Sequence, residues 1–105
     1  MDREVAWSPE ALDDVEAIAE YIERNSAFYA QAVATAILEM ARSIGRFPWM
    51  GRVVPEMGSQ NIGERFVYSY RVTYELQEGR ILIVAVIHGK RLIENISDRL
   101  AGSHE

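Results

Sequence analysis

The second half of the sequence holds side chains that could act together on a phosphate ester. They lie between residues 56 and 91 and comprise one carboxylate, one imidazole and several cations: Glu56, Arg65, Arg71, His88, Lys90 and Arg91. A carboxylate can accept a proton as a general base, an imidazole can donate one as a general acid, and a guanidinium can hold a phosphate with two hydrogen bonds. Structural roles compete with this interpretation, because Arg71 could pair with Glu75 or Glu56, and His88 could be a hydrogen-bonded residue at a strand end.

Several other chemistries are excluded by residue type. The sequence contains no cysteine, so it has no thiol nucleophile and no thiolate metal site. Its two histidines, His88 and His104, are not in a metal-binding pattern, and its glycines are scattered singly rather than grouped in a phosphate-binding loop. We therefore predict no metal and no cofactor. The acidic residues Asp13, Glu16 and Glu20 are interpreted as the solvated face of a helix rather than as a site.

Length and charge restrict the class of protein and its partners. The 105 residues are enough for one domain, which we place over residues 1–105. Asp and Glu outnumber Lys and Arg by 16 to 11, giving a net charge of -5, which is the wrong sign for tight, non-specific binding to nucleic acid. The N-terminus shows no secretion signal, and the apolar run 81–87 is too short to cross a membrane. We expect a cytoplasmic protein without membrane contact.

The first half of the sequence predicts a strand followed by a helical hairpin. Residues 3–7 have the alternation of a short strand, and Ser8 and Pro9 are a typical N-cap and first helical residue. Apolar residues then recur at helical spacing to about residue 24, and again over residues 26–45. The short connection makes the two helices antiparallel neighbours, whose shared apolar stripe must cover a sheet.

The second half predicts the sheet that the hairpin covers. Alternation from Phe66 onward, a polar-faced strand over 70–76 and an almost wholly apolar strand over 80–88 predict a three-stranded antiparallel meander, with 80–88 in the middle of one mixed sheet. A three-residue turn at 77–79 would place Arg71 opposite Ala85 and His88 opposite Tyr68, on different faces of the sheet. A short helix over 89–100 completes an α/β (α+β) fold.

The loop ends carry more large apolar side chains than a small domain needs to expose. They occur near the hairpin turn and after the second helix: Tyr21, Phe28, Tyr29, Phe47, Trp49 and Met50. If these side chains are exposed, they mark a protein interface. If they complete the core, the interface prediction fails.

Motifs spread over nearly the whole chain, in a specific order, resemble the RelE/ParE superfamily of toxins from bacterial type II toxin–antitoxin modules, a group that includes plasmid stabilisation proteins. The matching segments are Trp7-Ser8-Pro9-Glu10-Ala11-Leu12-Asp13-Asp14, Phe47-Pro48 with Gly51-Arg52, Pro55-Glu56, Tyr70-Arg71-Val72-Thr73-Tyr74, and Val86-Ile87-His88-Gly89-Lys90-Arg91. The resemblance implies a compact α/β toxin held inactive by a protein partner, its cognate antitoxin, whose extended or helical C-terminal segment wraps it. We assign the six apolar candidates to antitoxin binding.

The superfamily contains two activities. One branch cleaves mRNA on the ribosome. In this chain Glu56 would be the base and Arg71 the phosphate clamp, but the position of that branch's acid falls on Gly89 or Lys90 and not on His88.

The other branch, ParE, inhibits DNA gyrase, and its arginine in the middle strand and His-Gly-Lys-Arg after the last strand match this chain more closely. We therefore predict a ParE-like gyrase inhibitor that acts by binding, with the basic residues Arg65, Lys90, Arg91 and Arg99 as the target-binding surface. The alternatives are a RelE-like ribosome-dependent endoribonuclease, with the ribosome and mRNA as partners, and a non-toxic member that only binds its antitoxin.

Overall fold

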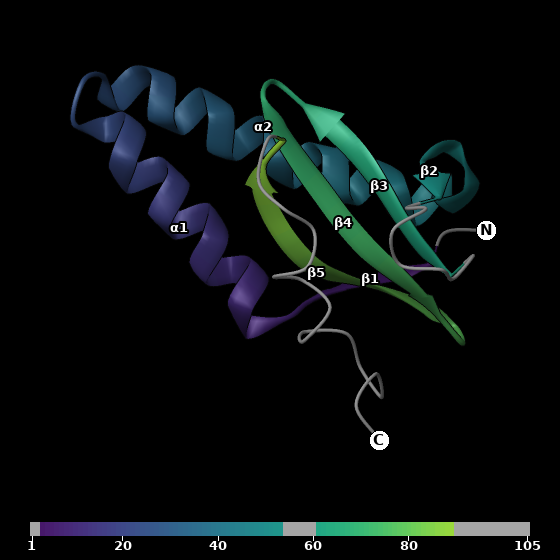
Figure 1. Ribbon diagram of the computed structural model, residues 1–105. Coiled ribbons are helices and arrows are strands. Elements are labelled where there is room, and N and C mark those ends of the chain that lie inside the picture. The colour runs from purple at the N-terminus through teal and green to yellow at the C-terminus, as the bar shows by residue number, and fades with distance from the viewer. Residues whose placement is uncertain (1–2, 54–60, 90–105) are drawn as a thin grey trace.

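Two α-helices and five strands build the part of the chain that the computed structural model describes, residues 3–53 and 61–89 (Figure 1). In chain order the elements are β1 (Glu4–Trp7), α1 (Pro9–Glu23), α2 (Ala27–Arg46), a 3-10 turn η1 (Pro48–Met50), β2 (Arg52–Val53), β3 (Ile62–Val67), β4 (Tyr70–Gln77) and β5 (Arg80–His88). The predicted N-terminal strand, helical hairpin and three-stranded meander are confirmed. The short helix predicted after β5 falls on residues that lie outside the described ones from position 90 onward.

Both helices begin where their capping residues predict. The Ser8 hydroxyl accepts a hydrogen bond from the Ala11 amide at 3.1 Å, and Pro9 follows as the first helical residue. The Ser26 hydroxyl accepts from the Tyr29 amide at 3.0 Å in the same way. Among the described residues, no helix combines the length and the apolar character needed to span a membrane.

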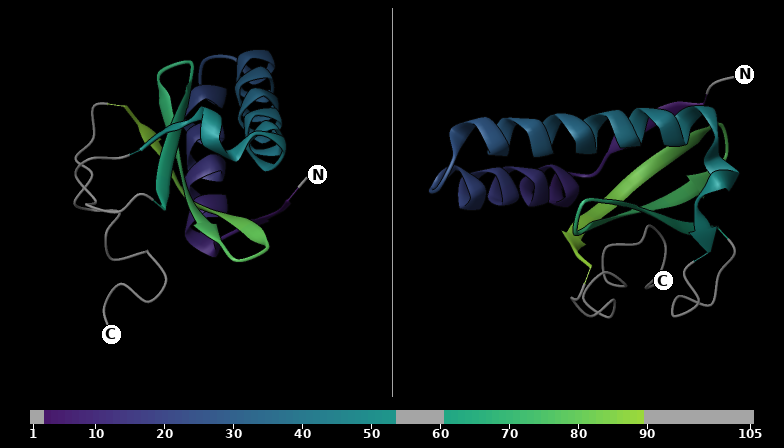
Figure 2. Two further views of the ribbon diagram at one scale, coloured as in Figure 1. Left: turned by 90° about the vertical axis from the view of Figure 1, so that its right-hand side faces the viewer. Right: turned by 90° about the horizontal axis from the view of Figure 1, so that it is seen from above.

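The helical hairpin covers one face of the sheet, which gives the molecule two layers (Figure 2). From α2, Val33, Ile37 and Ile44 are almost completely buried, and they pack in one cluster with Val72 of β4 and Ile83 of β5. The opposite sheet face has a second, smaller cluster around Ile62, Val84, Ala85 and Ile87. Side chains alternate between the two faces along a strand, so a polar residue on β4 points either toward the helices or away from them, according to its position in that alternation.

The strand order is β1-β5-β4-β3-β2. Strand β5 lies between β1, which pairs with it in parallel, and β4, which pairs with it antiparallel. Its central place agrees with its nearly continuous apolar sequence, because a mid-sheet strand is buried on both faces. The two-residue strand β2, which pairs with β3 at the far edge, was not predicted.

The predicted pairing of β4 with β5 is wrong by two residues. Arg71 pairs with Ile87, not Ala85, and His88 pairs with Tyr70, not Tyr68. Two causes add up. The turn is tighter than predicted, because Gln77 pairs directly with Arg80 around a Gly79 with φ of 78°, and the register shifts once more between Thr73 and Tyr74.

Candidate functional site

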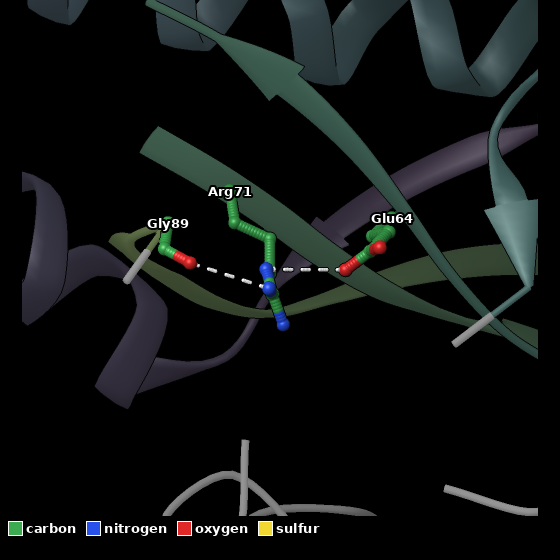
Figure 3. Close-up of polar contacts among 3 residues, drawn as sticks. All are labelled: Glu64, Arg71 and Gly89. Carbon is green, nitrogen blue, oxygen red and sulfur yellow. Dashed lines mark hydrogen bonds and ion pairs between the residues drawn. The ribbon is translucent and has the colours of Figure 1, made fainter. Parts of the chain in front are cut away.

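Arg71 lies on the sheet face opposite the helices, and most of its guanidinium is engaged by neighbouring groups (Figure 3). Its Nε is 3.2 Å from Oε1 of Glu64, in an ion pair, and its Nη2 donates a hydrogen bond to the Gly89 carbonyl at 3.3 Å. The face of the guanidinium lies over the Phe66 ring, with 5.6 Å between Cζ and the ring centroid. Only 12% of the Arg71 side chain is exposed.

Glu64 is the residue of this site that sequence reasoning missed. It is 1% exposed, and a buried carboxylate requires a charged or hydrogen-bonding partner. The β3–β4 pairing supplies one, because Phe66 stands directly opposite Arg71 and Glu64 stands opposite Thr73, so that Glu64 and Arg71 are diagonal neighbours on one face. The register of the β3–β4 hairpin would have been the signal that Glu64 lies beside Arg71. That register was hard to foresee, because the turn contains Tyr68 at a φ of 54°, a conformation that tyrosine seldom adopts.

Thr73 adds a third polar side chain to this face. It is fully buried, and its hydroxyl makes no hydrogen bond within the described part of the chain. Together Glu64, Arg71 and Thr73 form a polar strip across β3 and β4. The strip contains an anion, a cation and a hydroxyl, but it contains no imidazole that could act as a general acid.

His88 lies on the other face, beside the helices. It pairs directly with Tyr70, and the two rings meet edge to face with 5.9 Å between their centroids. Burial, with smaller contributions from Tyr29 and Tyr21, raises the pKa of Tyr70 above its usual value of 10.0. The prediction that Arg71 and His88 point to different faces is thus confirmed, although the register behind it was wrong.

Of the basic residues predicted to bind the target, only Arg65 lies in the part of the chain that the structure describes. Arg65 of β3 donates a hydrogen bond from Nη1 to the Ser43 hydroxyl near the C-terminal end of α2, at 3.2 Å. A cation at that helix end is electrostatically favourable. Glu56, Lys90, Arg91 and Arg99 lie outside the described residues, so the structure does not test their predicted roles.

The six apolar candidates are all exposed, as their assignment to an interface requires. Their exposed fractions range from 45% for Phe47 to 83% for Phe28. They form two groups at opposite ends of α2, which spans about 30 Å for its 20 residues. The first group lies near the α1–α2 turn and consists of Tyr21, Phe28 and Tyr29. The second lies on η1 and the residue before it and consists of Phe47, Trp49 and Met50.

A buried tyrosine holds the second group in place. The Tyr74 hydroxyl donates a hydrogen bond of 2.8 Å to the Pro48 carbonyl, which fixes η1 against β4. Two glycines make room for its ring, since a Cβ at Gly63 would come within 2.6 Å of the Tyr74 Cζ, and one at Gly51 would also collide with the hydroxyl. Burial raises the pKa of Tyr74 above 10.0. The exposed Trp49 and Met50 therefore project from a rigid base.

Comparison with known proteins agrees with this architecture. The family described as "ParE toxin of type II toxin-antitoxin system, parDE" matches residues 5–93. Toxin RelE2 of Caulobacter vibrioides is 30% identical over 89 residues, which cover 85% of this chain and 98% of the relative.

Solved structures show the same fold at low sequence identity. A chain of the chromosomal ParDE toxin–antitoxin system from P. aeruginosa superposes with a TM-score of 0.69 at 15% identity, covering 82% of this chain and 95% of the other. A chain of the RelBE2 toxin–antitoxin complex from Mycobacterium tuberculosis gives 0.63 at 17% identity, covering 84% and 99%. The chain belongs to the ParE toxin family of type II toxin–antitoxin systems, within the RelE/ParE superfamily.

Proposed function

We propose that this toxin acts in the cytoplasm by binding DNA gyrase, that it has no nuclease activity of its own, and that a cognate antitoxin neutralises it. The observation that carries the proposal is the separation of Arg71 from His88, which leaves this guanidinium without an imidazole acid beside it among the described residues. Arg71 points away from the helices and His88 points toward them, because they stand at adjacent, differently facing positions of the β4–β5 ladder.

The contacts of Arg71 also favour a structural role. A phosphate clamp must present its N–H groups to the ligand. In this chain Nε faces Glu64, Nη2 is bonded to Gly89 and one side of the guanidinium plane is covered by Phe66. A phosphate would have to compete with a fully buried carboxylate at 3.2 Å, which repels an anion.

The net charge of the chain also argues against a ribosome-docking nuclease. A ribosome-docking nuclease benefits from a cationic surface, whereas this sequence has a net charge of -5 and a single lysine. We keep Arg65, Lys90, Arg91 and Arg99 as the proposed target-binding residues, because they concentrate positive charge in an acidic chain. The exposed apolar groups around Phe28 and Trp49 remain the proposed antitoxin contacts.

A ribosome-dependent endoribonuclease is the second candidate. The relative named Toxin RelE2 favours it, and so does the presence of Arg71 in a strand position shared with the nuclease branch. Under this alternative Glu56 is the base and Arg71 binds phosphate. A member that binds its antitoxin without being toxic is the third candidate.

Parallel assays of the purified toxin separate these candidates. In one, the protein is added to gyrase with supercoiled plasmid, and stabilised cleavage complexes are measured; in the other, it is added to translating ribosomes, and cuts in a reporter mRNA are mapped. We expect cleavage complexes with intact message. Codon-spaced cuts in the message would refute the proposal, and induced expression without any growth defect would support the non-toxic member.

A further inference from the structure

A cleft separates α1 from the C-terminal part of β5, on the helix side of the sheet. Its volume is about 430 Å³, within the range of pockets that bind small ligands or anchor side chains. The described residues that line it are Asp14, Ala17, Ile18, Tyr21, Tyr70, Val86, Ile87 and His88. None of them belongs to the strip formed by Glu64, Arg71 and Thr73.

The cleft exists because β1 is shorter than β5. Strand β1 pairs with β5 only as far as Ile83, after which the chain turns into α1. As Figure 1 shows, α1 then runs beside the C-terminal part of β5. Beyond Ile83 the place of a neighbouring strand is taken by a side chain, since the Val86 amide donates a hydrogen bond of 2.9 Å to Oδ2 of Asp14.

The lining suits a side chain that is apolar along its stem and cationic at its head. Ala17, Ile18, Val86 and Ile87 provide apolar surface, and Asp14 is the only Asp, Glu, Lys or Arg among the described lining residues. The rings of Tyr21, Tyr70 and His88 add aromatic surface, and the faces of the two tyrosines attract cations. The chain already uses one ring in this way, because the Arg24 guanidinium lies 5.9 Å from the centroid of Tyr21.

The side of α1 that lines the cleft carries further acidic residues. Glu10, Asp13 and Glu20 recur at three- to four-residue steps with Asp14 and Ala17, so they follow the same side of α1. Within α1 there is no lysine or arginine to offset them. This field attracts a basic segment and repels an acidic one.

We propose that the cleft anchors an arginine or lysine side chain of the antitoxin, with its alkyl stem against Ile18 and Ile87 and its charged head between Asp14 and the aromatic rings. The proposal rests on the proposed function, because it assumes that the chain has an antitoxin. It goes beyond that function by naming the chemistry of the contact. The occupant is a basic segment of another protein, not a second copy of this acidic chain.

Substitution of Ala17 by arginine tests the anchor. Ala17 is an exposed helical residue, so Ala17→Arg preserves the fold while it places a competing cation in the cleft. Thr35→Arg is the matched control, because it adds the same charge at an exposed position of α2. Binding of each toxin variant to the antitoxin encoded beside the toxin gene is measured by calorimetry. Ala17→Arg should lower the affinity at least about 100-fold, whereas Thr35→Arg should lower it less than about threefold. Equal affinities of the two variants would overturn the proposal.

A second measurement does not depend on the antitoxin. The free toxin is titrated by NMR with two matched peptides, acetyl-Val-Arg-Val-amide and acetyl-Val-Glu-Val-amide. The arginine peptide should shift the signals of Ala17, Tyr21 and Val86, and Asp14→Asn, which keeps an oxygen for the Val86 amide, should weaken its binding about fivefold or more. Equal response to both peptides, or no response in the cleft, would overturn the proposal.

The two measurements also separate failure of the anchor from failure of the proposed function. If the wild-type chain does not bind the neighbouring protein while the arginine peptide still occupies the cleft, the antitoxin assignment fails and the cation site stands. If the antitoxin binds and Ala17→Arg is as tight as Thr35→Arg, the site fails and the proposed function stands. A toxin dimer that dissociates on Ala17→Arg would assign the cleft to a second copy and overturn the proposal.

Discussion

The buried ion pair between Glu64 and Arg71 predicts that the two residues are unequal in their effect on stability. Arg71→Ala removes the guanidinium that lies 3.2 Å from the fully buried carboxylate of Glu64, and removing one partner of a buried pair costs about 3–5 kcal/mol. Glu64→Gln leaves Arg71, whose side chain is 12% exposed and keeps its bond to the Gly89 carbonyl, so its cost is lower, about 1–3 kcal/mol. The double variant Glu64→Leu with Arg71→Met removes both charges and should lie close to the wild type.

Chemical denaturation followed by circular dichroism measures these free energies of unfolding. In thermal unfolding, Arg71→Ala should lower Tm by about 12 °C or more, since 1 kcal/mol corresponds to about 4–8 °C in a domain of this size. The order expected is double variant, then Glu64→Gln, then Arg71→Ala, from the most to the least stable. A double variant no more stable than Arg71→Ala would refute the reasoning, because the cost of Arg71→Ala would then not come from the buried carboxylate that it leaves behind.

The same variants decide what Arg71 does in the toxin. Loss of toxicity in Arg71→Ala is ambiguous, because an unfolded toxin is also inactive. The double variant removes the guanidinium together with the buried carboxylate beside it, so it should remain folded. It should retain gyrase inhibition if Arg71 is structural, and it should lose message cleavage if Arg71 binds phosphate.

Three further predictions concern stability. Tyr74→Phe leaves the Pro48 carbonyl without its buried donor and should lower the free energy of unfolding by about 1–3 kcal/mol in urea titrations; a change within experimental error would contradict the hydrogen bond. Ser8→Ala removes the N-cap of α1 and should cost about 0.5–2 kcal/mol, whereas Ser8→Gly should cost less. The raised pKa values of Tyr70 and Tyr74 mean that these groups ionise first in the unfolded chain, so their contribution to stability should be constant below about pH 9 and fall as pH rises through about 10 and above; stability that rises there, or a fall as steep in a variant with both tyrosines changed to phenylalanine, would count against this.

Local signals predicted the elements well, because they depend on neighbouring residues. The caps at Ser8 and Ser26 and the apolar run of β5 are read within a few positions, and the structure has them where the sequence places them. The pairing between β4 and β5 depends instead on the turn at Gly79 and on a shift at Thr73. A turn that is one residue tighter and a single bulge changed every pair near Arg71, although they left the two faces as predicted.

The polar site was harder to predict because its key pair is diagonal. Glu64 and Arg71 become neighbours only once the β3–β4 turn and its register are known. Nothing local to Glu64 distinguishes it from the other acidic residues of an acidic chain. Its burial is a consequence of tertiary structure, and only the three-dimensional arrangement shows that this carboxylate accompanies Arg71.

The pairing of the first strand with the last described one has a consequence for when the toxin can fold. Glu4 at the start of the chain lies beside Arg80, so the centre of the sheet is made of segments that leave the ribosome far apart in time. At a synthesis rate of about 5–20 residues per second, roughly 4–15 s pass between them. During that interval the apolar stripe of the helical hairpin has no strand β5 to cover. The sheet can therefore be completed only after the residues of β5 have left the ribosome.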